Sequence, residues 1–146
     1  STGSKHAGTV KRISEIIRDT IGKAAIISVQ DPIHLNEFNE PEPDVALLKR
    51  RSDFYTESHP TSDDVLVAIE VSDSTIKYDR ETKKLLYAEF GIAEFWLVDL
   101  TEEKIEVHTQ PRRGIYHKIL IFGQDEQLIS NAVENLNLDV NEILGL

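Results

Sequence analysis

Residues 65–69 form an unbroken apolar run, Val-Leu-Val-Ala-Ile, in which no alternate position is polar. A strand with one face in water would alternate between apolar and polar residues, so this run predicts a strand that is covered on both faces. Such a strand lies inside a sheet that carries other elements on each side. The run therefore favours an α/β fold over a helical bundle or a sheet with one wet face.

Helical periodicity occurs in two segments. Val10, Ile13 and Ile17 recur at helical spacing within residues 9–21, and Gly22 follows as a stop. In the second segment Asp79 is the predicted N-cap of a helix over residues 80–90, which ends at Gly91. The remaining strands are predicted at residues 24–29, 45–48, 94–99, 104–109, 115–122 and 127–129, and residues 50–63 read as a long exposed loop. This order predicts a single α/β domain over residues 1–146, with a mixed sheet flanked by helices.

The chain carries a formal net charge of −10, from 16 basic and 26 acidic residues. A polyanion is repelled by such a molecule as a whole, so binding of nucleic acid requires a local site.

The absence of cysteine excludes disulfides, thiolate metal sites and a cysteine nucleophile, and fits a cytoplasmic protein. No apolar run approaches the ~18 residues that span a bilayer. The chain begins at Ser1 and holds no methionine, so we expect that a native N-terminal segment is missing.

Two carboxylates stand next to predicted strands. Glu70 directly follows the apolar run, and Asp44 directly precedes the strand at 45–48. A carboxylate at the edge of a buried strand needs a cation, a metal or local solvent. The alternative reading is structural: Glu70 has emerged from the core, and Asp44 is a turn residue after Pro43.

A lysine on the second predicted helix adds to this pattern. Lys83, Leu86, Tyr87 and Phe90 follow the spacing i, i+3, i+4, i+7 and share the face that the helix should bury, whereas Lys84 points elsewhere. Lys83 either extends outward past the core or is held against carboxylates. Together with Asp44 and Glu70 it would form a divalent-metal site for water activation and phosphoryl chemistry. Carboxylate oxygens suit Mg²⁺ or Mn²⁺, which need only one or two protein carboxylates.

The motifs around these residues resemble the Uma-type restriction endonucleases, a branch of the PD-(D/E)XK nuclease superfamily. The resemblance runs from about His6 to the C-terminus, and its motifs are Glu42-Pro43-Asp44-Val45-Ala46, then Val67-Ala68-Ile69-Glu70-Val71-Ser72 with Ser74-Thr75, then Asp79, Lys83 and Tyr87, and finally Gly91-Ile92-Ala93-Glu94-Phe95-Trp96-Leu97-Val98-Asp99.

The resemblance implies a restriction-endonuclease-like core in which Asp44 and Glu70 bind Mg²⁺ or Mn²⁺ and the main-chain carbonyl of Val71 adds a ligand. The usual lysine of the superfamily falls on Ser72 here, and the family pattern moves it to Lys83. Some nuclease-fold proteins also use a glutamate of the first helix, for which Glu15 is the candidate. Family members usually carry a further N-terminal segment with a strand hairpin before the first helix, and the sequence begins almost at that helix, so we expect that it is truncated.

Other polar residues give weaker indications. Lys49, Arg50 and Arg51 end a predicted strand and lead into the long loop, so they would contact DNA phosphates if that loop lined the cleft; otherwise they are solvated surface. His6 could join the buried face of the first helix if that helix began early, although a histidine near a terminus is more often exposed. The remaining histidines show no zinc-ligand spacing.

These observations favour a Mg²⁺-dependent endonuclease that hydrolyses DNA, with Asp44, Glu70 and Lys83 as catalytic residues. The competing hypothesis is a non-catalytic nuclease-fold module that binds a protein partner, which the net charge supports. A third hypothesis is a hydrolase of small phosphorylated substrates. A homodimer is expected for an enzyme that cuts both strands of a duplex.

Overall fold

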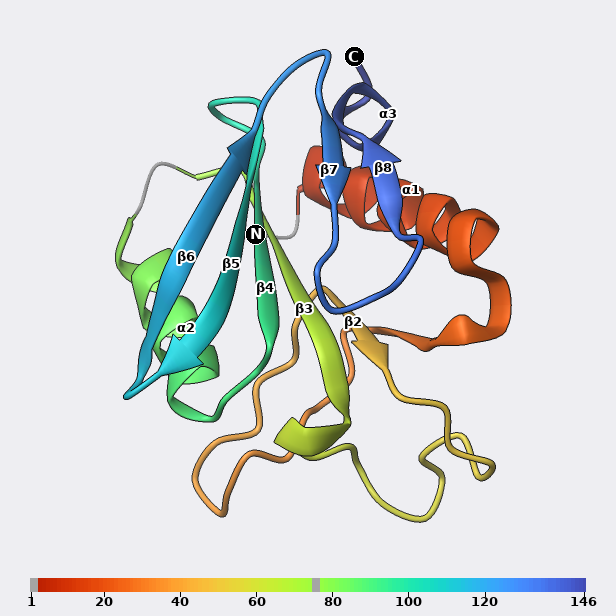
Figure 1. Cartoon of the computed structure of the whole chain (residues 1–146), viewed down its shortest axis with the longest axis vertical. Coiled ribbons are helices and arrows are strands. Elements are labelled where there is room, and N and C mark those ends of the chain that lie inside the picture. Colours follow the sequence, from red (N-terminus) through yellow and green to blue (C-terminus); the bar gives the residue numbers. More distant parts are fainter. Residues whose placement is uncertain (1–2, 75–76) are drawn as a thin grey trace.

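The computed structural model describes residues 3–74 and 77–146. Within these residues a six-stranded sheet has the order β1-β2-β3-β4-β5-β6, so every strand lies beside its neighbour in sequence (Figure 1). The strands are β1 (Ile26–Val29), β2 (Val45–Leu48), β3 (Val65–Ser72), β4 (Glu94–Asp99), β5 (Lys104–Arg112) and β6 (Ile115–Phe122).

The sheet is mixed, as the sequence predicts. Strands β3 and β4 are parallel, whereas the pairs β1–β2, β2–β3, β4–β5 and β5–β6 are antiparallel. A parallel pair needs a crossover, and α2 (Lys77–Glu89) supplies it between β3 and β4. The apolar run of β3 is at most 4% exposed at Val65, Val67, Ala68 and Ile69, which confirms a central strand covered on both faces.

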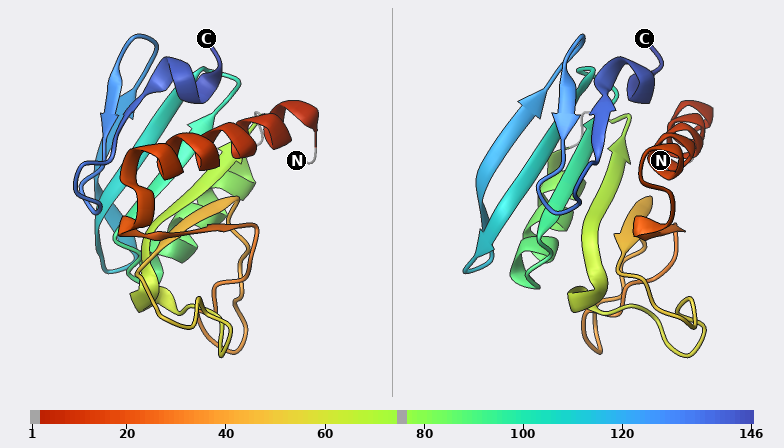
Figure 2. Two further views of the ribbon diagram at one scale, coloured as in Figure 1. Left: turned by 90° about the vertical axis from the view of Figure 1, so that its right-hand side faces the viewer. Right: turned by 45° about the vertical axis from the view of Figure 1, so that its right-hand side comes forward.

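The two faces of the sheet carry different layers (Figure 2). One face packs against α1 (Ser4–Ile21) and the C-terminal unit of β7 (Gln127–Ile129), β8 (Asn137–Asp139) and α3 (Val140–Leu144). The other face packs against α2. Alternate residues of β3 belong to the two cores, because successive side chains of a strand point to opposite faces: Val67 and Ile69 face α1, and Ala68 faces α2. Glu70 follows the same alternation and faces α2.

Several boundaries differ from the sequence prediction. The first helix begins at Ser4, five residues before the predicted start, and the side chain of Thr9 bonds back to the Lys5 carbonyl within it. Asp79 is wrong as an N-cap, because α2 begins at Lys77 and places Asp79 in its first turn. The first strand begins at Ile26 rather than at residue 24. Strand β8 and helix α3 were not predicted, since each is too short to show a period.

The predicted loop at residues 50–63 consists of turns and bends, with a short 3-10 turn, η2 (Ser62–Asp64), at its end; a second such turn, η1 (Gly22–Ala24), follows α1. Among the described residues, no helix is long and apolar enough to cross a membrane.

Candidate active site

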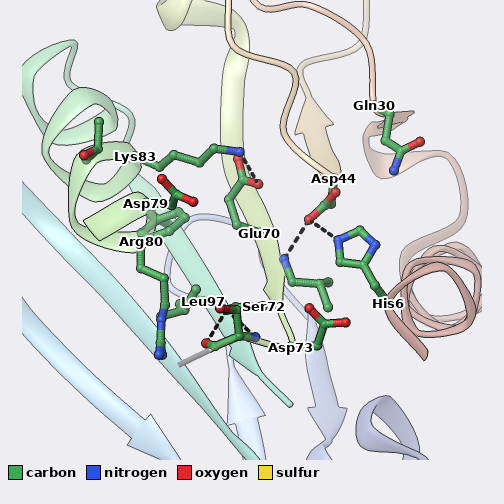
Figure 3. A pocket seen from close by; sticks show the side chains of 14 residues that line it. His6, Gln30, Asp44, Glu70, Ser72, Asp73, Asp79, Arg80, Lys83 and Leu97 are labelled. Atoms are coloured by element: carbon green, nitrogen blue, oxygen red, sulfur yellow. Dashed lines mark hydrogen bonds and ion pairs between the residues drawn. The ribbon is translucent and has the colours of Figure 1, made fainter. Parts of the chain in front are cut away.

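A pocket of about 300 Å³ opens where the C-terminal half of β3 meets the start of β2, the first turns of α1 and the N-terminal half of α2 (Figure 3). Val45 pairs with Ile69 across the antiparallel β2–β3 ladder. Continuing that register by one residue brings Asp44 beside Glu70. The strand pairing thus places the two carboxylates together, although they are 26 positions apart in the chain. The pocket is lined by His6, Gln30, Asp44, Glu70, Val71, Ser72, Asp73, Ser74, Asp79, Arg80, Thr82, Lys83, Phe95 and Leu97.

Asp44 is held from two sides. Its Oδ2 accepts a hydrogen bond of 2.8 Å from the backbone N–H of Val71 and lies 3.1 Å from Nε2 of His6. Its main chain is fixed as well, because the N–H of Gln30 lies 3.1 and 3.2 Å from the carbonyls of Pro43 and Asp44. Asp44 is 9% exposed, so its carboxylate is buried but borders the pocket.

Glu70 is bound through both of its oxygens. Lys83 Nζ donates to Oε1 at 3.1 Å, and the Tyr87 hydroxyl donates to Oε2 at 2.6 Å. Burial raises the pKa of Glu70 above its ordinary value; Lys83 and Tyr87 pull it back in part, and the negative charge of Asp44 adds to the rise. Burial and the neighbouring Glu70 likewise raise the pKa of Tyr87, which stays protonated as a donor. The site therefore holds a carboxylate whose charge needs compensation by a cation.

Lys83 reaches this carboxylate from the buried face of α2. Its side chain is 44% exposed, so the ammonium contacts Glu70 while its other side borders the open pocket. Lys84 instead forms a surface pair with Glu81 at 2.8 Å. Of the two readings that the sequence left open for Lys83, the structure has the one in which a carboxylate, that of Glu70, holds the lysine.

Arg80 lines the same pocket and was missed by the sequence analysis. Its Nη1 lies 2.9 Å from Oδ2 of Asp99, at the C-terminal end of β4. Burial raises the pKa of Asp99, but hydrogen bonds from Thr101 and Glu102 and the charge of Arg80 outweigh it, so the net shift is downward. Arg80 carried no sequence signal, because its partner lies 19 residues away on a strand that only the fold brings near.

His6 is also part of the pocket. Because α1 begins at Ser4, His6 falls on the same face as Thr9, Val10, Ile13 and Ile17, and it is 4% exposed. The expectation of an exposed terminal histidine was therefore wrong. The structure has the other reading, in which an early start of the helix places His6 on the buried face, four residues before Val10.

Four other candidates lie away from the pocket. Glu15 is exposed on α1 and does not line it. Lys49, Arg50 and Arg51 follow β2, whereas Asp44 precedes it, so the strand separates them from the carboxylates. Arg51 pairs with Asp53 at 2.6 Å and stacks over Tyr55, and Arg50 stacks over Phe54, so these two side chains brace the loop that contains them.

The donor set of the pocket fits a hard divalent cation that keeps waters of its own. Within the described residues no three His, Cys, Asp or Glu side chains are arranged to hold a metal by themselves. Mg²⁺ needs only one or two carboxylates, which Asp44 and Glu70 supply. The N–H of Val71 faces Asp44, and the N–H and C=O of a strand residue point to the same side, so its carbonyl faces that side too.

A mixed sheet flanked by helices, with two carboxylates and a lysine in one pocket at the end of a central strand, defines a nuclease-like α/β protein. The chain belongs to the Uma2 family, described as "Putative restriction endonuclease", whose model matches residues 1–141. No curated protein sequence matches the chain. A crystal structure described as a putative nuclease belonging to DUF820, from Anabaena variabilis, is similar in fold. It has a TM-score of 0.73 and 14% identity, and the match covers 98% of this chain and 82% of that one.

Proposed function

We propose that this protein is a Mg²⁺-dependent endonuclease that hydrolyses phosphodiester bonds in DNA. The observation that carries the proposal is the meeting of Asp44, Glu70 and Lys83 in one pocket of a chain from a nuclease family. The strand and helix patterns of the sequence indicate the same three residues. One nuclease-like domain over residues 1–146 is part of this proposal.

Asp44, Glu70 and the carbonyl of Val71 would hold Mg²⁺ or Mn²⁺ in this pocket. The cation supplies Lewis-acid chemistry when bound: it lowers the pKa of a water and polarises the phosphate. Burial raises the pKa of Glu70, so the protein by itself does not fully stabilise the negative charge of this carboxylate. A cation bound beside Glu70 would supply the missing stabilisation, which suits Glu70 to this task. Its ionisation and cation binding would then be coupled.

Lys83 would position the attacking water and offset the negative charge that grows on the phosphate. Its ammonium lies 3.1 Å from Glu70 and remains 44% exposed, so it can contact Glu70 and a substrate in the pocket together. Lys84, paired with Glu81 on the surface, would take no part.

DNA is the substrate that the family description supports. The net charge of −10 requires that the positive charge acting on DNA be local, and Arg80 and Lys83 bring such charge to the pocket. A phosphate contact by Lys49, Arg50 and Arg51 loses its support, because these residues lie beyond the opposite end of β2.

Calorimetric titration of Mn²⁺ and Mg²⁺ into the wild-type protein and Glu70→Ala tests the proposal without choosing a substrate. We expect binding by the wild type and its loss in the variant. Plasmid DNA should then be cut by the wild type alone, with circular dichroism verifying that the variant is folded. Absence of binding at millimolar metal, with and without DNA, would sink the proposal and favour the non-catalytic interaction module.

The same assay separates the third hypothesis. An enzyme for small phosphorylated substrates would hydrolyse nucleotides and leave plasmid and single-stranded DNA intact, whereas we expect the polymers to be cut.

A homodimer and a cytoplasmic location are further parts of the proposal. Two active sites related by a twofold axis suit the cleavage of two antiparallel strands. Sedimentation velocity should give twice the chain mass of 16.5 kDa, with or without DNA. The cysteine-free composition supports a reducing compartment.

A further inference from the structure

We infer that His6 is a positioning residue that fixes the side chain of Asp44 for cation binding; this inference rests on the proposed function. His6 lies on the first turn of α1, 38 residues from Asp44 in the chain, and its side chain is 5% exposed. A buried imidazole needs a hydrogen-bond partner, and the carboxylate at 3.1 Å provides it.

The direction of this bond follows from the chemistry of its partners. An ionised carboxylate only accepts hydrogen bonds, so Nε2 of His6 carries the proton and donates to Oδ2 of Asp44. The N–H of Val71 donates to the same oxygen at 2.8 Å. Two donors from different elements, α1 and β3, therefore hold one oxygen of the carboxylate, and Oδ1 is the oxygen that would bind the cation.

This arrangement sets the orientation of Asp44 before any cation arrives. A carboxylate held by a single donor can rotate about its terminal torsion, whereas a second donor from another direction fixes the plane of the group (Figure 3). Residues that orient a metal ligand through its other atoms commonly change metal affinity by 10–100-fold when they are removed. His6 also lines the pocket, but its imidazole contacts Asp44, so the function of His6 would lie in the N–H group that it presents to that carboxylate.

Two variants separate donation of a hydrogen bond from simple packing. His6→Leu fills the space without a donor, and His6→Gln keeps an N–H near the position of Nε2. His108→Leu is the matched control, because His108 is a buried histidine whose Nε2 lies 3.0 Å from Oε1 of Glu106 and which does not line the pocket.

The first measurement needs no metal. The amide of Val71 reports whether Asp44 keeps its place, so its ¹H–¹⁵N resonance should shift and its hydrogen exchange should accelerate in His6→Leu, but not in His6→Gln or His108→Leu. An unchanged Val71 amide in His6→Leu would overturn the inference.

The second measurement is calorimetry with Mn²⁺. We expect His6→Leu to bind 10–100-fold more weakly than the wild type, and His6→Gln to stay within about threefold of it. Equal losses in both variants, or no loss in either, would contradict a positioning role. If the wild type itself binds no Mn²⁺, the proposed function fails on its own, and the Val71 amide still decides whether His6 holds Asp44.

Discussion

Tyr87 and Lys83 lie one helical turn apart on α2 and bind different oxygens of the same carboxylate, with the Tyr87 hydroxyl 2.6 Å from Oε2 of Glu70 and the Lys83 ammonium 3.1 Å from Oε1. The i, i+4 spacing aligns both donors on the face that α2 turns to the sheet. Glu70 is therefore held by one neutral and one charged donor, which makes the contribution of each separable by mutation.

Replacing Tyr87 by Phe removes the neutral donor and leaves Oε2 of Glu70 buried without it. We expect the free energy of unfolding at neutral pH to fall by about 1–3 kcal/mol, the usual cost of an unsatisfied buried polar group. Urea denaturation followed by circular dichroism measures it. Unchanged stability would show that solvent or a rearranged side chain replaces the hydroxyl.

Glu70 should make the stability of the metal-free protein depend on pH. Its pKa is raised in the folded state above the ordinary value of 4.5, chiefly by burial. The unfolded chain therefore loses the proton first, so the contribution of Glu70 is fully present below pH 4.5 and is lost as the pH rises through the folded-state pKa. Compared with Glu70→Gln, which cannot titrate, the wild type should lose stability over this range. Parallel pH profiles of the two proteins in urea denaturation would contradict the assignment.

Lys83→Ala should reduce DNA cleavage by about 10²–10³-fold, the usual cost of removing one group that stabilises the charge of the transition state. Lys84→Ala is the matched control one residue along the same helix, and it should stay within about threefold of the wild type because its pair with Glu81 lies on the surface. Initial rates on supercoiled plasmid at saturating Mg²⁺ compare the two. Equal effects would indicate that the helix contributes only a general positive potential.

Glu94 is a buried carboxylate like Glu70, but we expect its removal to reduce stability and to leave metal binding unchanged. Glu94 accepts hydrogen bonds from Trp96 Nε1, Ser130 Oγ and the backbone N–H groups of Asn131 and Ala132, at 2.7 to 2.9 Å. These bonds tie β4 to the segment before β8. Glu94→Ala should cost about 3 kcal/mol or more of unfolding free energy. Mn²⁺ affinity of the folded variant should stay within about threefold of the wild type, and a larger loss would place Glu94 in the metal site.

Local pattern was sufficient to predict the framework of this protein. The apolar run at residues 65–69 predicted a strand covered on both faces, and the spacing of Lys83, Leu86 and Tyr87 predicted which lysine lies on the face that the helix buries. These patterns repeat every two residues in a strand and every 3.6 residues in a helix, so each can be recognised within its own segment. The positions of Asp44 and Glu70 beside predicted strands indicated them as a pair, the family motifs agreed, and the β2–β3 register brings them together.

Tertiary structure decided the contacts between segments. The early start of α1 turned His6 from a terminal residue into a buried partner of Asp44, and the crossover from β3 through α2 to β4 brought Arg80 to Asp99. The strand β2 put Lys49, Arg50 and Arg51 at the end away from the pocket. Such contacts depend on where distant elements pack, and no local period encodes that. The sequence by itself determined which faces are buried and which carboxylates stand at strand ends, while packing determined which donors meet those carboxylates.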